Sequence, residues 1–150
     1  MNSLFCNTME NSPGIIHQSK TGFSFQKEER LCSKKAIDHL FTEGSSFLTF
    51  PIKIVYAETT LPTLFPAQAA FAVSKKSFKR AVRRNYIKRL MREAYRLNKP
   101  SLYQGLDRSH QLAIFFIYIG KDIPDYKLIE TAMIKAVKKL IKKANEKEIK

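Results

Sequence analysis

Residues 112–119 read Leu-Ala-Ile-Phe-Phe-Ile-Tyr-Ile, and this uninterrupted apolar run constrains the fold more than any other segment of the chain. Eight residues are too few to cross a bilayer as a helix, which takes about 20. A short run rich in β-branched and aromatic residues is typical of a strand that is buried on both faces. We therefore expect a central strand over Gln111–Gly120, in a sheet that other elements cover on both sides.

Two further segments have the pattern of strands. Residues 47–58 alternate with a period of two, and residues 67–74 form a second, shorter run of small and apolar side chains. Pro51 lies inside the first of these segments and predicts either a break or an edge strand, because proline donates no ladder hydrogen bond.

Two segments before the central strand repeat their apolar residues at helical spacing. Residues 28–43 predict a helix with Ser33 as its N-cap and Gly44 as the glycine that ends it. Residues 80–99 predict a second helix, which we expect Pro100 to end, since proline removes a helical hydrogen bond.

A third amphipathic helix is expected from an N-cap at Asp125 to about Asn145. The order is then α, β, β, α, β, α, and two strands separated by a helix favour an α/β sandwich with at least one parallel pair. We predict a flexible N-terminal extension over residues 1–24, a single domain over 25–146, and a basic tail over 147–150.

The charge of the chain is distributed very unevenly. Residues 75–99 contain eleven basic side chains and one acidic side chain, a net charge of +10 out of a total of +14. Solvated helix faces usually mix the two signs, so this segment predicts a polyanionic partner, either nucleic acid or an anionic membrane. A membrane-surface helix keeps its large apolar residues free for lipid, whereas the sheet of this chain needs them, which favours nucleic acid.

A helical wheel divides residues 80–99 into two sides. The apolar side is expected to pack on the sheet and comprises Val82, Tyr86, Ile87, Leu90, Met91, Ala94 and Leu97. The opposite side is a basic ridge of Arg84, Lys88, Arg92, Arg96 and Lys99, with Asn85 and Arg89 beside it. Guanidinium groups match phosphate oxygens in two-point contacts, and lysine adds point charge, so the ridge is suited to a ribose-phosphate chain.

No catalytic or metal-binding residue is predicted in the protein itself. The two cysteines and three histidines are scattered, which excludes a disulfide framework and gives no zinc-ligand spacing. Asp107, Asp122 and Asp125 lie at expected turn and cap positions, where Asp is common for backbone reasons. The N-terminus has no signal-peptide pattern, and we expect a cytoplasmic protein.

The residues Ala72-Val73-Ser74-Lys75-Lys76, followed by Ala81-Val82, Arg84-Asn85, Ile87-Lys88-Arg89 and Arg92-Glu93, resemble the signature of the bacterial ribonuclease P protein component. Arg30-Leu31 before the first helix and Phe41-x-x-Gly44 at its end also resemble that family. The resemblance covers about residues 25–145.

Two features depart from the family pattern. Tyr86 replaces the second arginine of the Arg-Asn-Arg triplet, so Arg83 must supply that phosphate contact, or Tyr86 stacks or packs instead. The connector Ser77–Arg80 is longer than the usual glycine-containing one, which is expected to change how the chain enters the helix.

The resemblance implies an α-β sandwich of the ribosomal protein S5 domain 2-like type, with a four-stranded sheet, three helices and a left-handed βαβ crossover. It also implies a protein subunit that assists a catalytic RNA in removing the 5′ leader from precursor tRNA, with Mg²⁺ held mainly by the RNA. Its partners would be that catalytic RNA and the precursor tRNA, with no membrane and no obligate protein partner.

The charge pattern and the resemblance together predict two sets of RNA-contacting residues. The residues expected on the catalytic RNA are Lys75, Lys76, Arg80, Arg83, Arg84, Asn85, Lys88, Arg89, Arg92 and Arg96. By position in the family, the single-stranded leader would lie in a cleft between the first helix and the sheet, lined by Ile37, Phe41, Lys53 and Tyr56. Aromatic rings beside a cation suit single-stranded RNA, although Phe41 by its type alone would more often be a core residue.

Three classes of function follow. The first is the ribonuclease P subunit, the second is a non-catalytic RNA-binding protein of the ribosome or its assembly, and the third is a basic protein of the membrane surface. The ordered Ser-Lys-Lys, Arg-Asn and Lys-Arg motif favours the first over the second. Salt-sensitive binding to RNA but not to anionic vesicles would exclude the third.

Overall fold

The computed structural model describes residues 24–106 and 111–149, with side chains to residue 146. Over this range the elements are η1 (Lys27–Glu29), α3 (Lys34–Glu43), β1 (Ser45–Thr49), β2 (Ile52–Glu58), β3 (Ala67–Val73), α4 (Ala81–Gly105), β4 (Leu112–Tyr118) and α5 (Tyr126–Ile149). The extension expected over residues 1–24 lies almost wholly outside the described residues. Residues 147–149, expected to be part of a basic tail, belong to the backbone of α5.

The sheet has the strand order β1-β2-β4-β3. β1 and β2 form an antiparallel hairpin, and Pro51 lies in the turn between them with a cis Phe50–Pro51 peptide bond. β2 is antiparallel to β4, whereas β3 is parallel to β4. The parallel pair and the central position of β4 are therefore confirmed, and Pro51 divides the predicted first strand in two.

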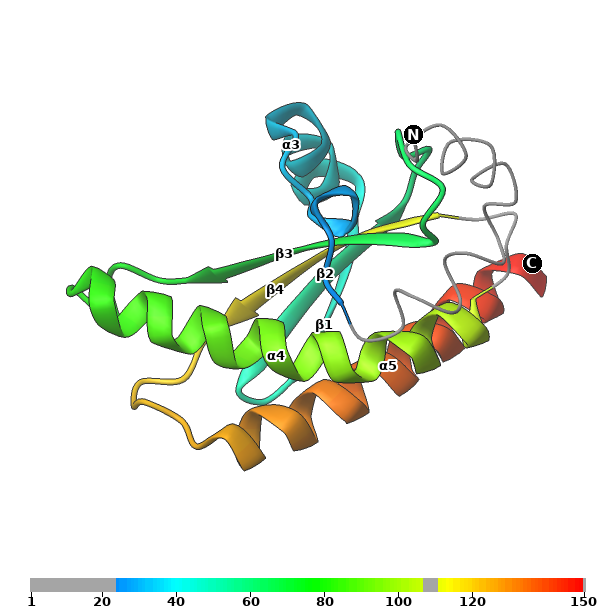
Figure 1. The fold of residues 1–150 in the computed structure, drawn as a ribbon. Coiled ribbons are helices and arrows are strands. Elements are labelled where there is room, and N and C mark those ends of the chain that lie inside the picture. Colours follow the sequence, from blue (N-terminus) through cyan, green and yellow to red (C-terminus); the bar gives the residue numbers. More distant parts are fainter. Residues whose placement is uncertain (1–23, 107–110, 150) are drawn as a thin grey trace, which may run out of the picture.

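The parallel strands β3 and β4 are neighbours joined through α4. In Figure 1 both arrows point to the left, with the arrowhead of β3 above that of β4, and α4 runs back on the viewer's side of the sheet. This path is a left-handed crossover, the rare sense for such a connection. It places α4 beside β3, so that one side of α4 lies near the free edge of the sheet.

Each face of the sheet has its own apolar core, as the run in β4 requires. On one face, Ile114 and Phe116 of β4 pack with the buried sides of α4 and α5. On the other, Ala113 packs in a smaller cluster with Leu40 of α3. Alternate residues of β4 thus serve different layers, because successive side chains of a strand point to opposite faces.

Helix α3 follows the predicted N-cap Ser33 and ends at the predicted Gly44, whereas residues 28–32, which were also expected to be helical, lie outside it. Gly44 is needed for a reason other than its backbone conformation. Ser33 is the N-cap, and its Oγ accepts a hydrogen bond of 3.3 Å from the amide of Ala36. Gly44 has a φ of −76°, which any residue can adopt. A Cβ at Gly44 would lie 2.3 Å from the carbonyl oxygen of Leu40 and 2.9 Å from that of Tyr56, so close backbone packing excludes a side chain there.

The prediction that Pro100 ends the second helix is wrong, since α4 continues to Gly105. The missing proline amide costs the helix about 3 kcal/mol. Leu102 and Leu106 beyond it are buried in the main core, and the Tyr103 hydroxyl donates a 2.6 Å hydrogen bond to Glu29 Oε1. This tertiary packing offsets the local cost of the proline.

Candidate nucleic-acid interface

The residues predicted to contact RNA lie along the N-terminal half of α4 and the connector before it. They form one basic face of the molecule. The side chains of this face differ in how far they are exposed to solvent. Exposed are Lys75, Lys76, Arg80, Arg83, Asn85 and Arg89, and half-buried are Arg84, Lys88, Arg92 and Arg96.

The buried side of α4 is rotated relative to the wheel prediction. Ile87, Met91 and Ala94 are buried as expected, together with Tyr95. Val82, Tyr86 and Leu97, which the wheel placed on the sheet, are instead 79%, 47% and 40% exposed, respectively. The apolar pattern of α4 is wider than the strip that the sheet covers, so the packing decides which of its residues are buried.

The rotation has opposite consequences for Lys99 and Tyr86. Lys99, predicted to lie on the basic ridge, is buried and forms an ion pair with Glu29, so it is removed from the interface. Tyr86, which replaces the family arginine, is not packed in the core, and its exposed ring remains accessible to a ligand.

Arg84 is only partly available to a ligand. Its Nη1 donates hydrogen bonds of 2.7 Å to the carbonyl of Phe78 and 2.8 Å to that of Lys79. Phe78 is buried in the main core, so Arg84 fastens the long connector Ser77–Arg80 to the first turn of α4. The connector is thus anchored by its own phenylalanine and by a residue of the motif helix.

Acidic side chains are almost absent from the basic face of α4. Glu93 is the single acidic residue of residues 75–99. Its Oε2 accepts a 2.7 Å hydrogen bond from Nε of Arg96, so one arginine is already neutralised. The remaining guanidiniums and ammoniums of the face carry an unbalanced positive charge in the free protein, as binding to a polyanion requires.

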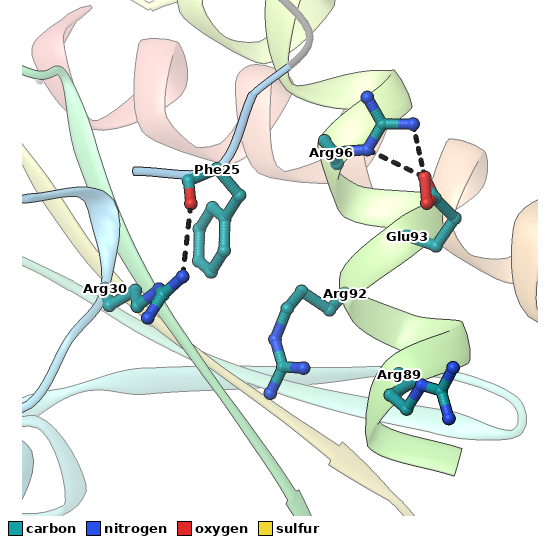
Figure 2. Close-up of a pocket in the computed structure, with 6 residues that line it drawn as sticks. All are labelled: Phe25, Arg30, Arg89, Arg92, Glu93 and Arg96. Atoms are coloured by element: carbon teal, nitrogen blue, oxygen red, sulfur yellow. Dashed lines mark hydrogen bonds and ion pairs between the residues drawn. The ribbon is translucent and has the colours of Figure 1, made fainter. Parts of the chain in front are cut away.

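Phe25, Arg30 and Glu93, which are not among the predicted RNA-contacting residues, line a hollow of about 300 Å³ against this face. The hollow lies between the N-terminal segment and α4, and Figure 2 shows its lining: Phe25, Arg30, Arg89, Arg92, Glu93 and Arg96. Arg30 belongs to a motif noted in the sequence, but its placement beside α4 depends on contacts between residues 70 to 75 positions apart, those of Ser24 and Glu29 with Lys99 and Tyr103.

Three of the four residues predicted to line the leader cleft lie on the same face of the sheet. Ile37 and Phe41 of α3 lie on the sheet face that carries Val55 and Phe115. The Phe41 ring is 52% exposed and lies 5.0 Å from the Phe115 ring, in an edge-to-face arrangement. Lys53 is exposed and shares this face, since it is two residues before Val55 on β2.

The placement of Tyr56 in that cleft is wrong. Tyr56 is 4% exposed in the core that α4 and α5 cover, where its ring lies 5.9 Å from that of Phe47. Strand alternation explains the error, because Val55 and Tyr56 point to opposite faces. Phe115 supplies an aromatic ring beside Phe41 instead, and the alternation of β4 could have identified it.

A cluster of metal ligands and a membrane-spanning helix are both absent from the part of the chain that the structure describes. No three Asp, Glu, His or Cys side chains there lie close enough together to hold a metal ion. Asp107, one of the acids considered above, lies outside the described residues. Among the described helices, none is both long enough and apolar enough to cross a membrane.

Comparisons with known proteins agree with the motif and the fold. The family model described as "Ribonuclease P" matches residues 25–145. The "Ribonuclease P protein component" of Porphyromonas gingivalis strain W83 is 38% identical over 116 residues, covering 77% of this chain and 85% of that protein. The protein of the same name from Chlorobium phaeobacteroides is 38% identical, with 71% of this chain and 80% of that protein covered.

Solved structures show the same fold at lower sequence identity. The RNase P protein of Staphylococcus aureus aligns with a TM-score of 0.59 at 20% identity, over 76% of this chain and 95% of that one. The protein from Thermotoga maritima aligns with a TM-score of 0.59 at 22% identity, over 74% and 96%. From the matched motif, the family model and these relatives, the chain belongs to the ribonuclease P protein component family, the protein subunit of the bacterial enzyme that processes the 5′ ends of tRNA.

Proposed function

We propose that this protein binds the catalytic RNA of ribonuclease P through the basic face of α4 and holds the 5′ leader of precursor tRNA against α3. The observation that carries the proposal is that Arg83 and Arg89 of α4 are exposed and Arg92 is half-buried, on a side with one acidic residue. Neutralising RNA phosphates there releases counterions, which drives association.

The chemistry in this proposal belongs to the RNA. Mg²⁺ would be held mainly by the RNA subunit, since the described protein residues offer no cluster of ligands for it. The protein contributes charge neutralisation and substrate positioning, which raise the rate by holding the reacting phosphodiester in place. Both partners are cytoplasmic RNAs in this proposal.

The leader would lie on the open part of the sheet face beside α3. Phe41 offers a half-exposed ring for base stacking, and Lys53 offers a cation on the same face. Stacking on aromatic side chains combined with phosphate pairing is the usual way of holding single-stranded RNA. A duplex would not suit this face, because its bases are already stacked.

Reconstitution tests the proposed function directly. The purified protein is mixed with a bacterial ribonuclease P RNA at low Mg²⁺ concentration, and cleavage of a precursor tRNA at the 5′ end is followed. We expect the protein to restore cleavage that the RNA alone does not sustain. RNA binding without any restored cleavage would instead support a non-catalytic RNA-binding protein.

The exposed Arg89 is the best single test of the basic face. We expect Arg89→Ala to weaken binding to the catalytic RNA and to reduce the slope of log K against log salt by about 0.7–0.9, the value for one lost phosphate contact. Binding is measured by titration at several salt concentrations. Lys142→Ala, which removes one exposed charge from α5, is the matched control. An unchanged slope in Arg89→Ala would exclude the assignment.

Truncating Phe41 tests the leader site. We expect Phe41→Ala to weaken binding of precursor tRNA to the holoenzyme by about 5- to 150-fold, which corresponds to the roughly 1–3 kcal/mol of one base stack. Binding of mature tRNA, which has no leader, should not change. Leu64→Ala, at a 75% exposed apolar residue of a loop, is the control. Equal losses for both tRNAs would contradict a leader contact.

A further inference from the structure

We propose that the N-terminal segment adds a second arm to the RNA interface, so that a single RNA phosphate is clamped between Arg30 and Arg92. This inference rests on the proposed binding to the catalytic RNA and adds a binding site to it. Figure 2 shows the two guanidiniums on opposite sides of the hollow, Arg30 from the N-terminal segment and Arg92 reaching toward it from α4.

The backbone places Arg30 at the free edge of the sheet. Arg30 forms an isolated parallel bridge with Ala69 of β3, and the amide of Leu31 donates a 2.9 Å hydrogen bond to the carbonyl of Ala69. β3 is an outer strand, so the segment extends the sheet by a short piece of backbone. The basic side of α4 lies at this edge, because Arg89, Arg92 and Arg96 line the same hollow as Arg30.

A buried polar network fixes the same segment to α4. Glu29, at 0% exposure, forms an ion pair with Lys99, which also donates a hydrogen bond to the carbonyl of Ser24. Burial, together with the neighbouring Tyr95 and Glu29, raises the pKa of Tyr103, so its hydroxyl keeps the proton that it donates to Glu29. Lys99 and Tyr103 therefore hold Glu29, the residue next to Arg30, and Lys99 also holds Ser24, so the backbone at Arg30 is positioned before any ligand binds.

The Arg30 side chain is oriented by an aromatic ring. Its guanidinium carbon lies 5.6 Å from the centre of the Phe25 ring, and Nη2 donates a long hydrogen bond of 3.5 Å to the Phe25 carbonyl. The Phe25 ring is held in turn by edge-to-face contacts with Phe71 and Tyr95. Stacking uses the face of a guanidinium and leaves N–H groups of its edge for a ligand.

Among the described residues, the acidic side chain that lines the hollow is Glu93, and it does not balance Arg30 and Arg92. Arg92 has no hydrogen-bond or ion-pair partner among the described residues, and Glu93 on the rim is paired with Arg96 on the side away from Arg30. Arginine stays protonated at any accessible pH, so the two guanidiniums repel each other until an anion binds. A phosphodiester suits the site, because each guanidinium can bind phosphate oxygens in the two-point manner.

The volume of the hollow also suits one unit of a single RNA chain. About 300 Å³ is at the low end of the range for small-molecule pockets. A phosphate with its ribose can enter such a space, whereas a helix of RNA can contact only its rim. Arg89 on the rim would then bind a neighbouring phosphate of the same chain.

A double-mutant cycle tests the clamp. Affinity for a bacterial ribonuclease P RNA is measured for the wild type, Arg30→Ala, Arg92→Ala and the double variant. We expect each single change to weaken binding on the order of tenfold, and the double variant to lose clearly less than the product of the two. Arg30→Lys should fall between wild type and Arg30→Ala, because it keeps the charge but loses the two-point contact.

The outcomes separate this inference from the proposed function. If the wild type does not bind the RNA in a salt-dependent way, the proposed function itself fails. If Arg89→Ala weakens binding but Arg30→Ala does not, or if the two losses multiply in the double variant, the clamp alone is overturned. Circular dichroism and thermal unfolding of Arg30→Ala should match the wild type, since the Arg30 side chain is exposed.

Discussion

Replacing Lys99 with methionine is expected to lower the free energy of unfolding by about 3–5 kcal/mol, the usual cost of leaving one partner of a buried ion pair without the other. Lys99 and Glu29 are 1% and 0% exposed. Methionine fills the space of the lysine chain, so the expected loss is that of an uncompensated carboxylate rather than that of a cavity. The decrease in the free energy of unfolding is measured by urea unfolding, followed by circular dichroism.

The double variant Glu29→Gln/Lys99→Met is the control for this result. Removing the second charge should recover part of the loss, because the remaining amide is neutral and can still accept a hydrogen bond from the Tyr103 hydroxyl. A loss below about 1 kcal/mol in Lys99→Met, or the same loss in both variants, would show that the pair is not buried as described.

Replacing Gly44 with alanine is expected to destabilise the fold by about 2 kcal/mol or more. The φ of −76° is an ordinary one, so alanine would otherwise gain slightly from the reduced freedom of the unfolded chain. The added Cβ would instead lie 2.3 Å and 2.9 Å from two backbone carbonyl oxygens, those of Leu40 and Tyr56. Backbone atoms of a helix and a strand cannot move independently, so α3 would have to shift on the sheet.

Gly105→Ala is the matched control for this effect. A Cβ there would meet the side chain of Ile141 at 2.7–2.9 Å and no backbone atom within that distance, so α5 can yield slightly where two backbone carbonyls cannot. We expect a smaller loss than in Gly44→Ala, about 1 kcal/mol, measured by the same unfolding experiment, since alanine also favours the helix. Equal losses at the two glycines would mean that the approach of α3 to β2 is not rigid. The shift of α3 in Gly44→Ala should also weaken leader binding, because α3 carries Phe41.

Most elements of the fold could be predicted because their signals are local. The apolar run of β4 required cover on both faces, and the Ser33 cap and the periodic stripe of α5 marked helices from neighbouring residues alone. The errors occurred where distant contacts outweigh local preference. Pro100 did not end α4, because the burial of Leu102 beyond it offsets the cost of the proline.

The candidate site, too, could be predicted in part from local features and in part depends on distant contacts. The concentration of basic residues in residues 75–99 is a property of the sequence, and so is the motif by which the family was identified. The sequence did not show which of those residues are free, since Arg84 fastens the connector and Lys99 is buried. Nor did it show that Tyr56 faces the other core, because one position of register decides the face.

Local patterns were enough to predict the layered architecture, the charge of α4 and the kind of partner, because periodicity, capping and charge act over a few neighbouring residues. The tertiary structure alone decided which side of α4 is buried and brought Arg30 to the free edge of the sheet opposite Arg92. The physical reason is that burial and side-chain pairing join residues far apart in the chain, as in the pair of Glu29 and Lys99, and only the folded packing brings such residues together.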